Sequence, residues 1–350
     1  MRTVCVIQER SQLIIEAIIC EQTWRRYSHP GDEFVTLNCS DKADCYGTQV
    51  RQWNTFYSPE YSEKIMSAAN HSKAPDRSEM FTLMKCINQT VAWHQYLQTV
   101  PDDEVVELID MDLLYCRPFP VKYRTIGYND VFCESIYEPW HMHTSVDGED
   151  DPEEVSNRWV LEQFDPSLPI GQNDEGVYQP IIGKAHTLRS LIHEMVNIIP
   201  KFVNTPNLDS RLLWWTSMFC LPLAANRLNL KLTPIVQTRI PCTEYTKSKI
   251  GYGATDKDFR AYHYSIPTGA KNFQKWKIVE YLLNGYTPTD EHVEAIPENS
   301  IPEDDVYFHE FMRRFFANTE ALIPISKLIA KHCPDEYDHD PVFWSQRKIA

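Results

Sequence analysis

The sequence lacks several patterns that would place it in a common class of protein. Its 350 residues contain no run of about 18 apolar residues, so no membrane span is predicted. The ten cysteines are scattered and form no C-x-x-C pair, which argues against a structural zinc site and against a small disulfide framework. Lysine and arginine form only short pairs in a chain of net charge −15, so we expect no nucleic-acid partner.

Glycine-rich phosphate-binding motifs and a leader sequence are also missing. The chain contains neither G-x-x-x-x-G-K-[ST] nor G-x-G-x-x-G, so no glycine loop is available to cradle a phosphate. The N-terminal apolar run is too short for a signal peptide, and polar residues follow it at once. The sequence as written predicts a cytoplasmic protein, although a trimmed domain from the Golgi lumen would have the same sequence features. Three sequons, at Asn38, Asn70 and Asn88, would matter only in a secretory lumen.

The first 110 residues alternate between apolar strands and amphipathic helices. We predict strands over 3–8, 33–40 and 104–110, and helices over 11–27 and 78–100. An alternation of strands and helices is typical of an α/β fold with a doubly wound, mainly parallel sheet flanked by helices.

The rest of the chain is less regular. Residues 120–180 are rich in Pro, Asn, Asp and aromatic residues, with a short strand candidate at 124–129. Further helices are predicted over 185–199 and 208–229, and a strand over 259–265. The C-terminal part is predicted to be helical over 272–283 and 304–332, with a break at Pro324. We predict one domain over 1–280 and a C-terminal helical arm over 281–350.

A pair of carboxylates, Asp110 and Asp112, follows the apolar run "EVVELI". Side chains two residues apart in a strand point to the same side, so the two carboxylates should converge. Ligands of open α/β sheets bind outside the carboxyl ends of the strands, where this pair lies. Two hard oxygen ligands suit Mg²⁺ or Mn²⁺, which would neutralise a nucleoside diphosphate in the absence of a glycine loop. A polar strand end that faces water is the alternative reading.

Four segments in this order resemble the GT-A glycosyltransferases, and most closely the hydroxyproline O-arabinosyltransferase and peptidyl serine α-galactosyltransferase group. They are the first strand and helix "CVIQERSQLIIEAIICEQTWRRY", "SKAPDRSEMF", "DDEVVELIDMDLLYCRPF" and "RAYHYSIPTGAKNFQKW". The resemblance covers about residues 3–280. Two features depart from it: Glu107 stands within the apolar strand, and Trp214 and Trp215 stand where those enzymes carry an acidic residue.

The resemblance implies a GT-A (Rossmann-like) fold and a DXD metal site that binds a UDP-sugar through Mn²⁺ or Mg²⁺. Asp110 would contact the ribose or the metal, Asp112 would bind the metal, and His263 would be the third protein ligand. Gly269 and Lys271 would lie against the diphosphate. The resemblance also points to retention, with a pentose or galactose-like sugar moved to a hydroxyl of a protein or glycan acceptor.

Other candidate residues come from their place along the chain. Gln8 and Arg10 follow the first strand, where the nucleotide would lie. Asp174 and Glu175, in the irregular middle, could hold sugar hydroxyls or stabilise the anomeric centre, and Trp140 could contact the acceptor. For each of these residues, a purely structural role in a turn, on the surface or in packing is a competing interpretation. Two other functions stay open: a nucleotidyltransferase, and a catalytically silent relative that binds glycans or partners.

Overall fold

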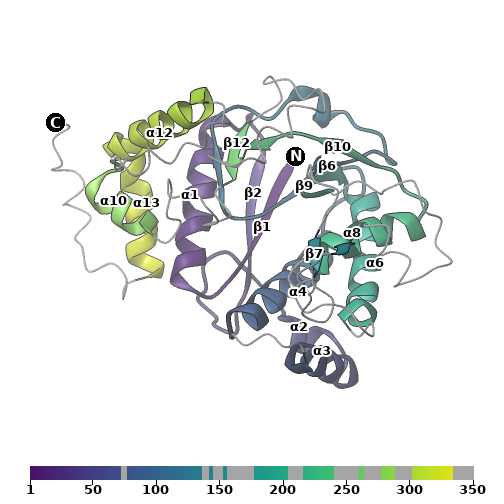
Figure 1. The fold of residues 1–350 in the computed structure, drawn as a ribbon. Coiled ribbons are helices and arrows are strands. Elements are labelled where there is room, and N and C mark those ends of the chain that lie inside the picture. The colour runs from purple at the N-terminus through teal and green to yellow at the C-terminus, as the bar shows by residue number, and fades with distance from the viewer. Residues whose placement is uncertain are drawn as a thin grey trace. The chain divides into compact units, whose positions relative to one another are not determined.

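The computed structural model describes residues 1–71, 77–135, 142–144, 153–155, 177–203, 216–239, 260–263, 277–287 and 302–333 (Figure 1). The chain divides into two compact units. The first consists of residues 1–8, 35–109 and 121–235, and the second of residues 9–34, 110–120 and 236–350. The chain therefore crosses from the first unit to the second directly after Ile109.

A seven-stranded sheet forms the centre of the first unit. Its order is β10-β6-β9-β4-β1-β2-β3. The strands are β1 (Arg2–Gln8), β2 (Glu33–Cys39), β3 (Thr48–Val50), β4 (Val105–Ile109), β6 (Val131–Ser135), β9 (Val177–Lys184) and β10 (Leu232–Ile235). Strand β1 runs parallel to β4, β2 to β3 and β10 to β6, whereas β9 is antiparallel to both of its neighbours. The expected α/β fold with a mixed, mainly parallel sheet flanked by helices is confirmed.

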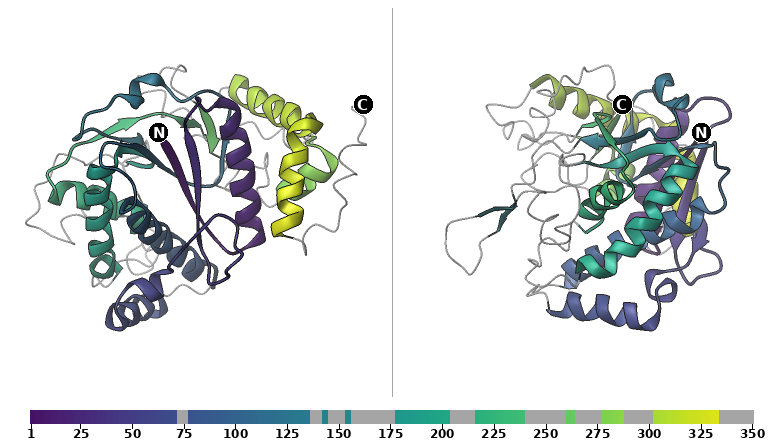
Figure 2. Two further views of the ribbon diagram at one scale, coloured as in Figure 1. Left: turned by 180° about the vertical axis from the view of Figure 1, so that it is seen from behind. Right: turned by 90° about the vertical axis from the view of Figure 1, so that its right-hand side faces the viewer.

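Helices cover this sheet within the first unit. They are α2 (Trp53–Phe56), α3 (Pro59–His71), α4 (Arg77–Leu97), α6 (Ala185–Val203) and α8 (Thr216–Arg227). Helix α6 contacts α4 and α8, and α4 also contacts β1. Figure 2 shows α6 and α8 side by side in both of its views. Apolar side chains between these helices and the sheet, such as Val91 and Leu97 of α4, are fully buried and form the core.

The second unit contains a three-stranded sheet and four helices among its described residues. The sheet has the order β11-β12-β5, formed by Thr238–Arg239, Ala261–His263 and Leu113–Tyr115. The helices are α1 (Ser11–Tyr27), α10 (Ile278–Asn284), α12 (Pro302–Ala317) and α13 (Thr319–His332). Helices α1 and α13 pack against each other, as Figures 1 and 2 show. The predicted domain boundary at 281 stays a prediction.

Three local predictions are wrong. The segment 124–129 is not a strand: the helical turn η1 (Val121–Arg124) precedes a turn in which Asp130 accepts a hydrogen bond from the Gly127 amide. The C-terminal helix does not break at Pro324, which lies inside α13. The break is at Asn318, whose side chain accepts from the Ala321 amide and so caps α13.

The third error concerns β9, which the sequence analysis placed in an irregular segment. Its Pro180 and Gly183 both disfavour a strand, because proline donates no ladder hydrogen bond and glycine adds no packing. Seven of its eight residues are nevertheless buried between β4 and β6, so tertiary packing decides the structure.

Two smaller structural elements complete the described part of the chain. Strands β7 (Met142–Thr144) and β8 (Glu153–Val155) pair antiparallel with each other. No helix in the described ranges has the length and apolar character needed to cross a bilayer. None of the nine cysteines within the described residues forms a disulfide with another described residue.

Candidate metal centre

The bend between β4 and β5 places the two predicted aspartates. Strand β4 ends at Ile109, so Asp110 and Asp112 are not in one continuous strand as the sequence analysis assumed. Asp110 instead accepts a hydrogen bond from the neighbouring Met111 amide, at 2.9 Å from N to Oδ1. This bend, and not strand alternation, brings the two carboxylates to the same side.

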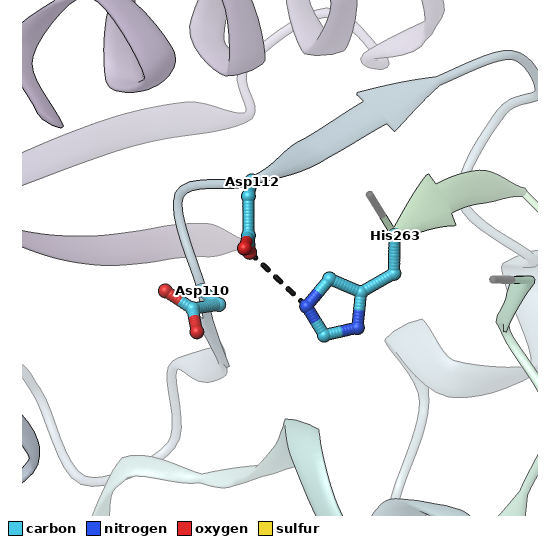
Figure 3. A group of neighbouring side chains, drawn as sticks. All are labelled: Asp110, Asp112 and His263. Atoms are coloured by element: carbon cyan, nitrogen blue, oxygen red, sulfur yellow. Dashed lines mark hydrogen bonds and ion pairs between the residues drawn. The ribbon is translucent and has the colours of Figure 1, made fainter. Parts of the chain in front are cut away.

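Pairing between β5 and β12 brings His263 to the aspartates. The two strands are antiparallel, with His263 opposite Leu113 and therefore beside Asp112. His263 Nε2 lies 3.0 Å from Asp112 Oδ1, and the two side chains face each other in Figure 3. The aspartate is almost completely buried, at 2% exposure, while the imidazole is 20% exposed. A buried carboxylate needs a compensating positive charge or hydrogen bonds, and the imidazole is one such partner.

The three side chains form the one group of three or more His, Cys, Asp or Glu residues in the described ranges that could hold a metal ion. One ligand atom from each of Asp110, Asp112 and His263 lies within 4.8 Å of the others (Figure 3). Two carboxylate oxygens and one imidazole nitrogen fit a divalent ion such as Mn²⁺. A six-coordinate ion on three protein ligands keeps positions for phosphate oxygens and water. The donor set therefore suits the predicted cofactor.

The remaining predicted residues are distributed differently. Gln8 ends β1 in the first unit, and its side-chain nitrogen is buried without a hydrogen-bond partner among the described residues. Arg10 belongs to the second unit, is exposed, and precedes α1, where its carbonyl accepts from the Ile14 amide. Five predicted residues lie outside the described residues: Trp140, Asp174, Glu175, Gly269 and Lys271. Their roles stay predictions.

Glu107, which departs from the resembled family, has a structural partner. It is fully buried in β4, and its Oε2 accepts a hydrogen bond of 2.8 Å from Thr3 Oγ1 on the neighbouring strand β1. The register pairs Glu107 directly with Thr3. The glutamate is therefore part of the sheet interior and leaves the candidate metal centre unchanged.

A buried amide network in the first unit was not found from the sequence. Gln89 of α4 and Gln179 of β9 exchange two hydrogen bonds of 3.1 and 3.2 Å, and Tyr178 Oη bonds both Gln89 and Ser217. Because β9 is antiparallel to β4, these residues lie at the edge where the carboxyl end of β4 points. Nothing in the sequence indicates that uncharged polar residues from a predicted helix and a predicted loop will contact each other.

A pocket lies elsewhere in the first unit. It has a volume of about 590 Å³ and is lined beside the edge strand β3 by Ser40, Gln49, Arg51 and Tyr96, among others. None of the predicted site residues lines it.

Comparison with known proteins gives structural neighbours only. No protein-family model and no curated protein matches the sequence. The similar solved structures include the bifunctional glycosyltransferase WbbM, with a TM-score of 0.42 at 11% identity. The match covers 88% of this chain, but this chain spans only about half, 51%, of the length of WbbM. The galactosyltransferase LgtC in complex with donor and acceptor sugar analogues has a TM-score of 0.42 at 8% identity, over 80% of this chain and 94% of its own. Mouse xyloside xylosyltransferase 1 has a TM-score of 0.41 at 11% identity, over 76% of this chain and 98% of its own. At these low scores, the functional assignment rests on the residues of the site.

Proposed function

We propose that the protein is a metal-dependent glycosyltransferase that uses a nucleotide-sugar donor. The observation that carries the proposal is the grouping of Asp110, Asp112 and His263 within 4.8 Å, formed by residues 151 positions apart in the chain. The divalent ion would supply positive charge to the diphosphate that leaves the sugar. UDP as the nucleotide, Mn²⁺ as the ion, and a pentose or galactose-like sugar follow from the sequence resemblance.

Each of the predicted site residues would bind one part of the reacting system: the ion, the donor or the acceptor. Asp112 and His263 would hold the ion, and Asp110 would hold the ion or the ribose. Lys271 would add charge at the diphosphate, and Gly269 would allow its close approach. Gln8 and Arg10 would contact the nucleotide, while Asp174, Glu175 and Trp140 would contact the transferred sugar and the acceptor, a protein or a glycan.

Transfer with retention needs no protein base in this scheme. The bond between the anomeric carbon and the diphosphate oxygen breaks, and the acceptor oxygen forms the new bond on the same face. A β-phosphate oxygen of the donor takes the acceptor's proton. The transition state resembles an oxocarbenium ion, so carboxylates such as Asp174 and Glu175 would stabilise it if they face the anomeric carbon.

The test is a panel of nucleotide sugars incubated with the full chain, with and without Mn²⁺, with release of nucleoside diphosphate as the readout. We expect metal-dependent release from at least one UDP-sugar. The variant Asp112→Asn should lower this release at least 100-fold, whereas Asp103→Asn, an exposed aspartate, should leave it unchanged. Absence of metal-dependent diphosphate release from every donor would refute the proposal.

The same panel separates the two alternative functions. A nucleotidyltransferase would consume a nucleoside triphosphate and release pyrophosphate, so triphosphates with sugar phosphates are included. A catalytically silent relative would bind a donor or glycan in a calorimetric titration and release no diphosphate.

A further inference from the structure

Arg260 is an almost completely buried cation three residues before His263. It is 2% exposed, and its guanidinium carbon lies 4.8 Å from the centroid of the Tyr115 ring and 4.6 Å from that of the Phe119 ring. Its Nε donates a 2.9 Å hydrogen bond to Gln237 Oε1, which is also buried. Burial lowers the pKa of Arg260 to about 9, and nearby Cys20 and Asp32 oppose this shift, so the side chain is charged at neutral pH.

The main chain of Arg260 is held as firmly as its side chain. Its carbonyl accepts hydrogen bonds from the Cys116 and Arg117 amides, at 2.8 and 3.2 Å, directly after β5. Its amide donates to the Gln237 carbonyl at 2.9 Å, directly before β11. Arg260 therefore joins the strands on both sides of β12 at the point where β12 begins.

These contacts adjoin a very short strand. Strand β12 has three residues, and their pairing places Ala261 opposite Tyr115 and His263 opposite Leu113. A slip of one residue would turn the His263 side chain to the other face of the sheet. Three residues of pairing specify the register weakly, whereas a guanidinium fixed between two rings next to the strand specifies it strongly.

We propose that Arg260 is a positioning residue: by filling the space between Tyr115 and Phe119 it fixes the register of β12 and so holds His263 Nε2 against Asp112. This inference rests on the proposed metal-dependent function, because it concerns the same three side chains. Arg260 acts through His263 and does not itself touch the metal, the donor or the acceptor.

The test is a double-mutant cycle with Mn²⁺ affinity, measured by electron paramagnetic resonance of the free ion, as the readout. Arg260→Met, which keeps the side-chain length without the planar cation, should weaken Mn²⁺ binding at least tenfold. In a chain that already carries His263→Ala, the same substitution should weaken binding less than twofold further, because the residue through which Arg260 acts is gone. The matched control is Arg26→Met, since Arg26 also lies over a ring, that of Phe315 at 5.2 Å, and should leave the affinity unchanged.

If Arg260→Met does not fold, a second variant, Arg260→Lys, and a second measurement, amide hydrogen exchange, still test the inference. Lysine keeps the charge without the planar fork, so Arg260→Lys should weaken Mn²⁺ binding by an intermediate factor. An unchanged affinity in the folded Arg260 variants, or equal losses in the presence and absence of His263, would overturn the inference.

Hydrogen exchange also separates failure of this inference from failure of the proposed function. If the wild-type chain binds no Mn²⁺, the proposed function fails, and the register is then measured in the metal-free protein. Loss of protection at the Cys116 and Arg117 amides in the Arg260 variants, but not in Arg26→Met, would support the inference. Unchanged protection at these two amides would refute it.

Discussion

At the scale of single residues, His263 has two competing partners for the same ring nitrogen. Nε2 donates its hydrogen to Asp112, at 3.0 Å, and the same nitrogen would bind the proposed metal. A metal needs the lone pair of that nitrogen, so binding displaces the proton from it. The hydrogen bond that aligns the imidazole for the metal is thus the one that the metal replaces.

Gly47 and Gly31 allow a comparison of backbone strain with steric contact. Both have a positive φ, 87° and 86°, which alanine adopts at a cost of about 1–2 kcal/mol. A Cβ on Gly47 would lie 2.5 Å from the Thr36 carbonyl oxygen, whereas a Cβ on Gly31 would meet nothing within 4 Å. We expect Gly31→Ala to lower the free energy of unfolding by about 1 kcal/mol and Gly47→Ala by about 3 kcal/mol or more. Denaturant unfolding measures both, and equal losses would contradict the predicted contact.

Two of the three sequons are incompatible with glycosylation of the folded chain. Asn38 is fully buried and its Nδ2 donates to the Tyr46 carbonyl at 2.9 Å. Asn88 is 4% exposed and its Oδ1 accepts from the Trp53 amide at 2.7 Å. A glycan on either nitrogen would have to displace the core around it, so these sequons carry no information on the compartment.

Sequence reasoning at this scale found the three residues that the structure groups, Asp110, Asp112 and His263, but did not find Arg260. Asp110 and Asp112 were recognisable because they are adjacent and follow an apolar strand, and His263 entered through the resemblance. Arg260 has the sequence context of an ordinary surface arginine. Its burial depends on Tyr115 and Phe119, more than 140 positions away, which no local pattern reports.

At the scale of helices and strands, long periodic segments were predicted well and short ones poorly. Helix α1 was predicted over its full length, 11–27, because its isoleucines recur at helical spacing, and all four of them are buried. Strand β9 was missed because its Pro180 and Gly183 are local signals against a strand, while the buried position between β4 and β6 is not visible locally. Strand β5, with three residues, is too short for a period to be recognised, whereas β12 lies within the strand predicted over 259–265.

Helix α13 should contribute to the stability of the second unit through its buried face. Ile329 is fully buried and α13 packs on α1, while the Cys333 thiol after the helix contacts the Ser11 carbonyl at 3.8 Å. Ile329→Ala should lower the free energy of unfolding by about 2–5 kcal/mol. The exposed Lys327 of the same helix gives the control, because Lys327→Ala should change it by no more than about 0.5 kcal/mol. A loss for Ile329→Ala near that of the control would show that residues 281–350 behave as a loosely attached arm.

Helices α4 and α6 meet at a histidine pair that makes the first unit sensitive to acid. His94 Nε2 lies 3.0 Å from His193 Nδ1, and His94 also contacts Gln98 and the Phe56 ring. Burial, and then the charge that His193 can carry, lower the pKa of His94 below its usual value.

The sign of the resulting pH dependence follows from this lowered pKa. In the unfolded chain His94 takes up a proton near its ordinary pKa of about 6.5, whereas in the folded chain it does so only at lower pH. The unfolded state therefore binds more protons in this window, and stability falls as the pH drops below about 6.5. Thermal unfolding at pH 7.5 and 5.5 should show a smaller acid destabilisation for His94→Gln than for the wild type. An unchanged difference would mean that other groups carry the effect.

At the scale of the whole molecule, the division into two units places the candidate metal centre in one of them. Asp110, Asp112 and His263 all belong to the second unit, although the strand that precedes Asp110 belongs to the first. A ligand that binds only the folded state stabilises the region that must be folded to hold it. The metal should therefore act on the two units unequally.

Amide hydrogen exchange in the absence and presence of Mn²⁺ measures this difference. At a metal concentration about 100-fold above the dissociation constant, the free energy of opening should rise by up to about 2.7 kcal/mol in β5, β12 and α1 of the second unit. Amides of α6 and α8 in the first unit should change less, because these helices can open without disrupting the metal ligands. The Asp112→Asn variant should show no change in either unit. Equal protection of both units by Mn²⁺ would show that they open as one cooperative structure, and protection confined to the first unit would place the metal away from the three residues.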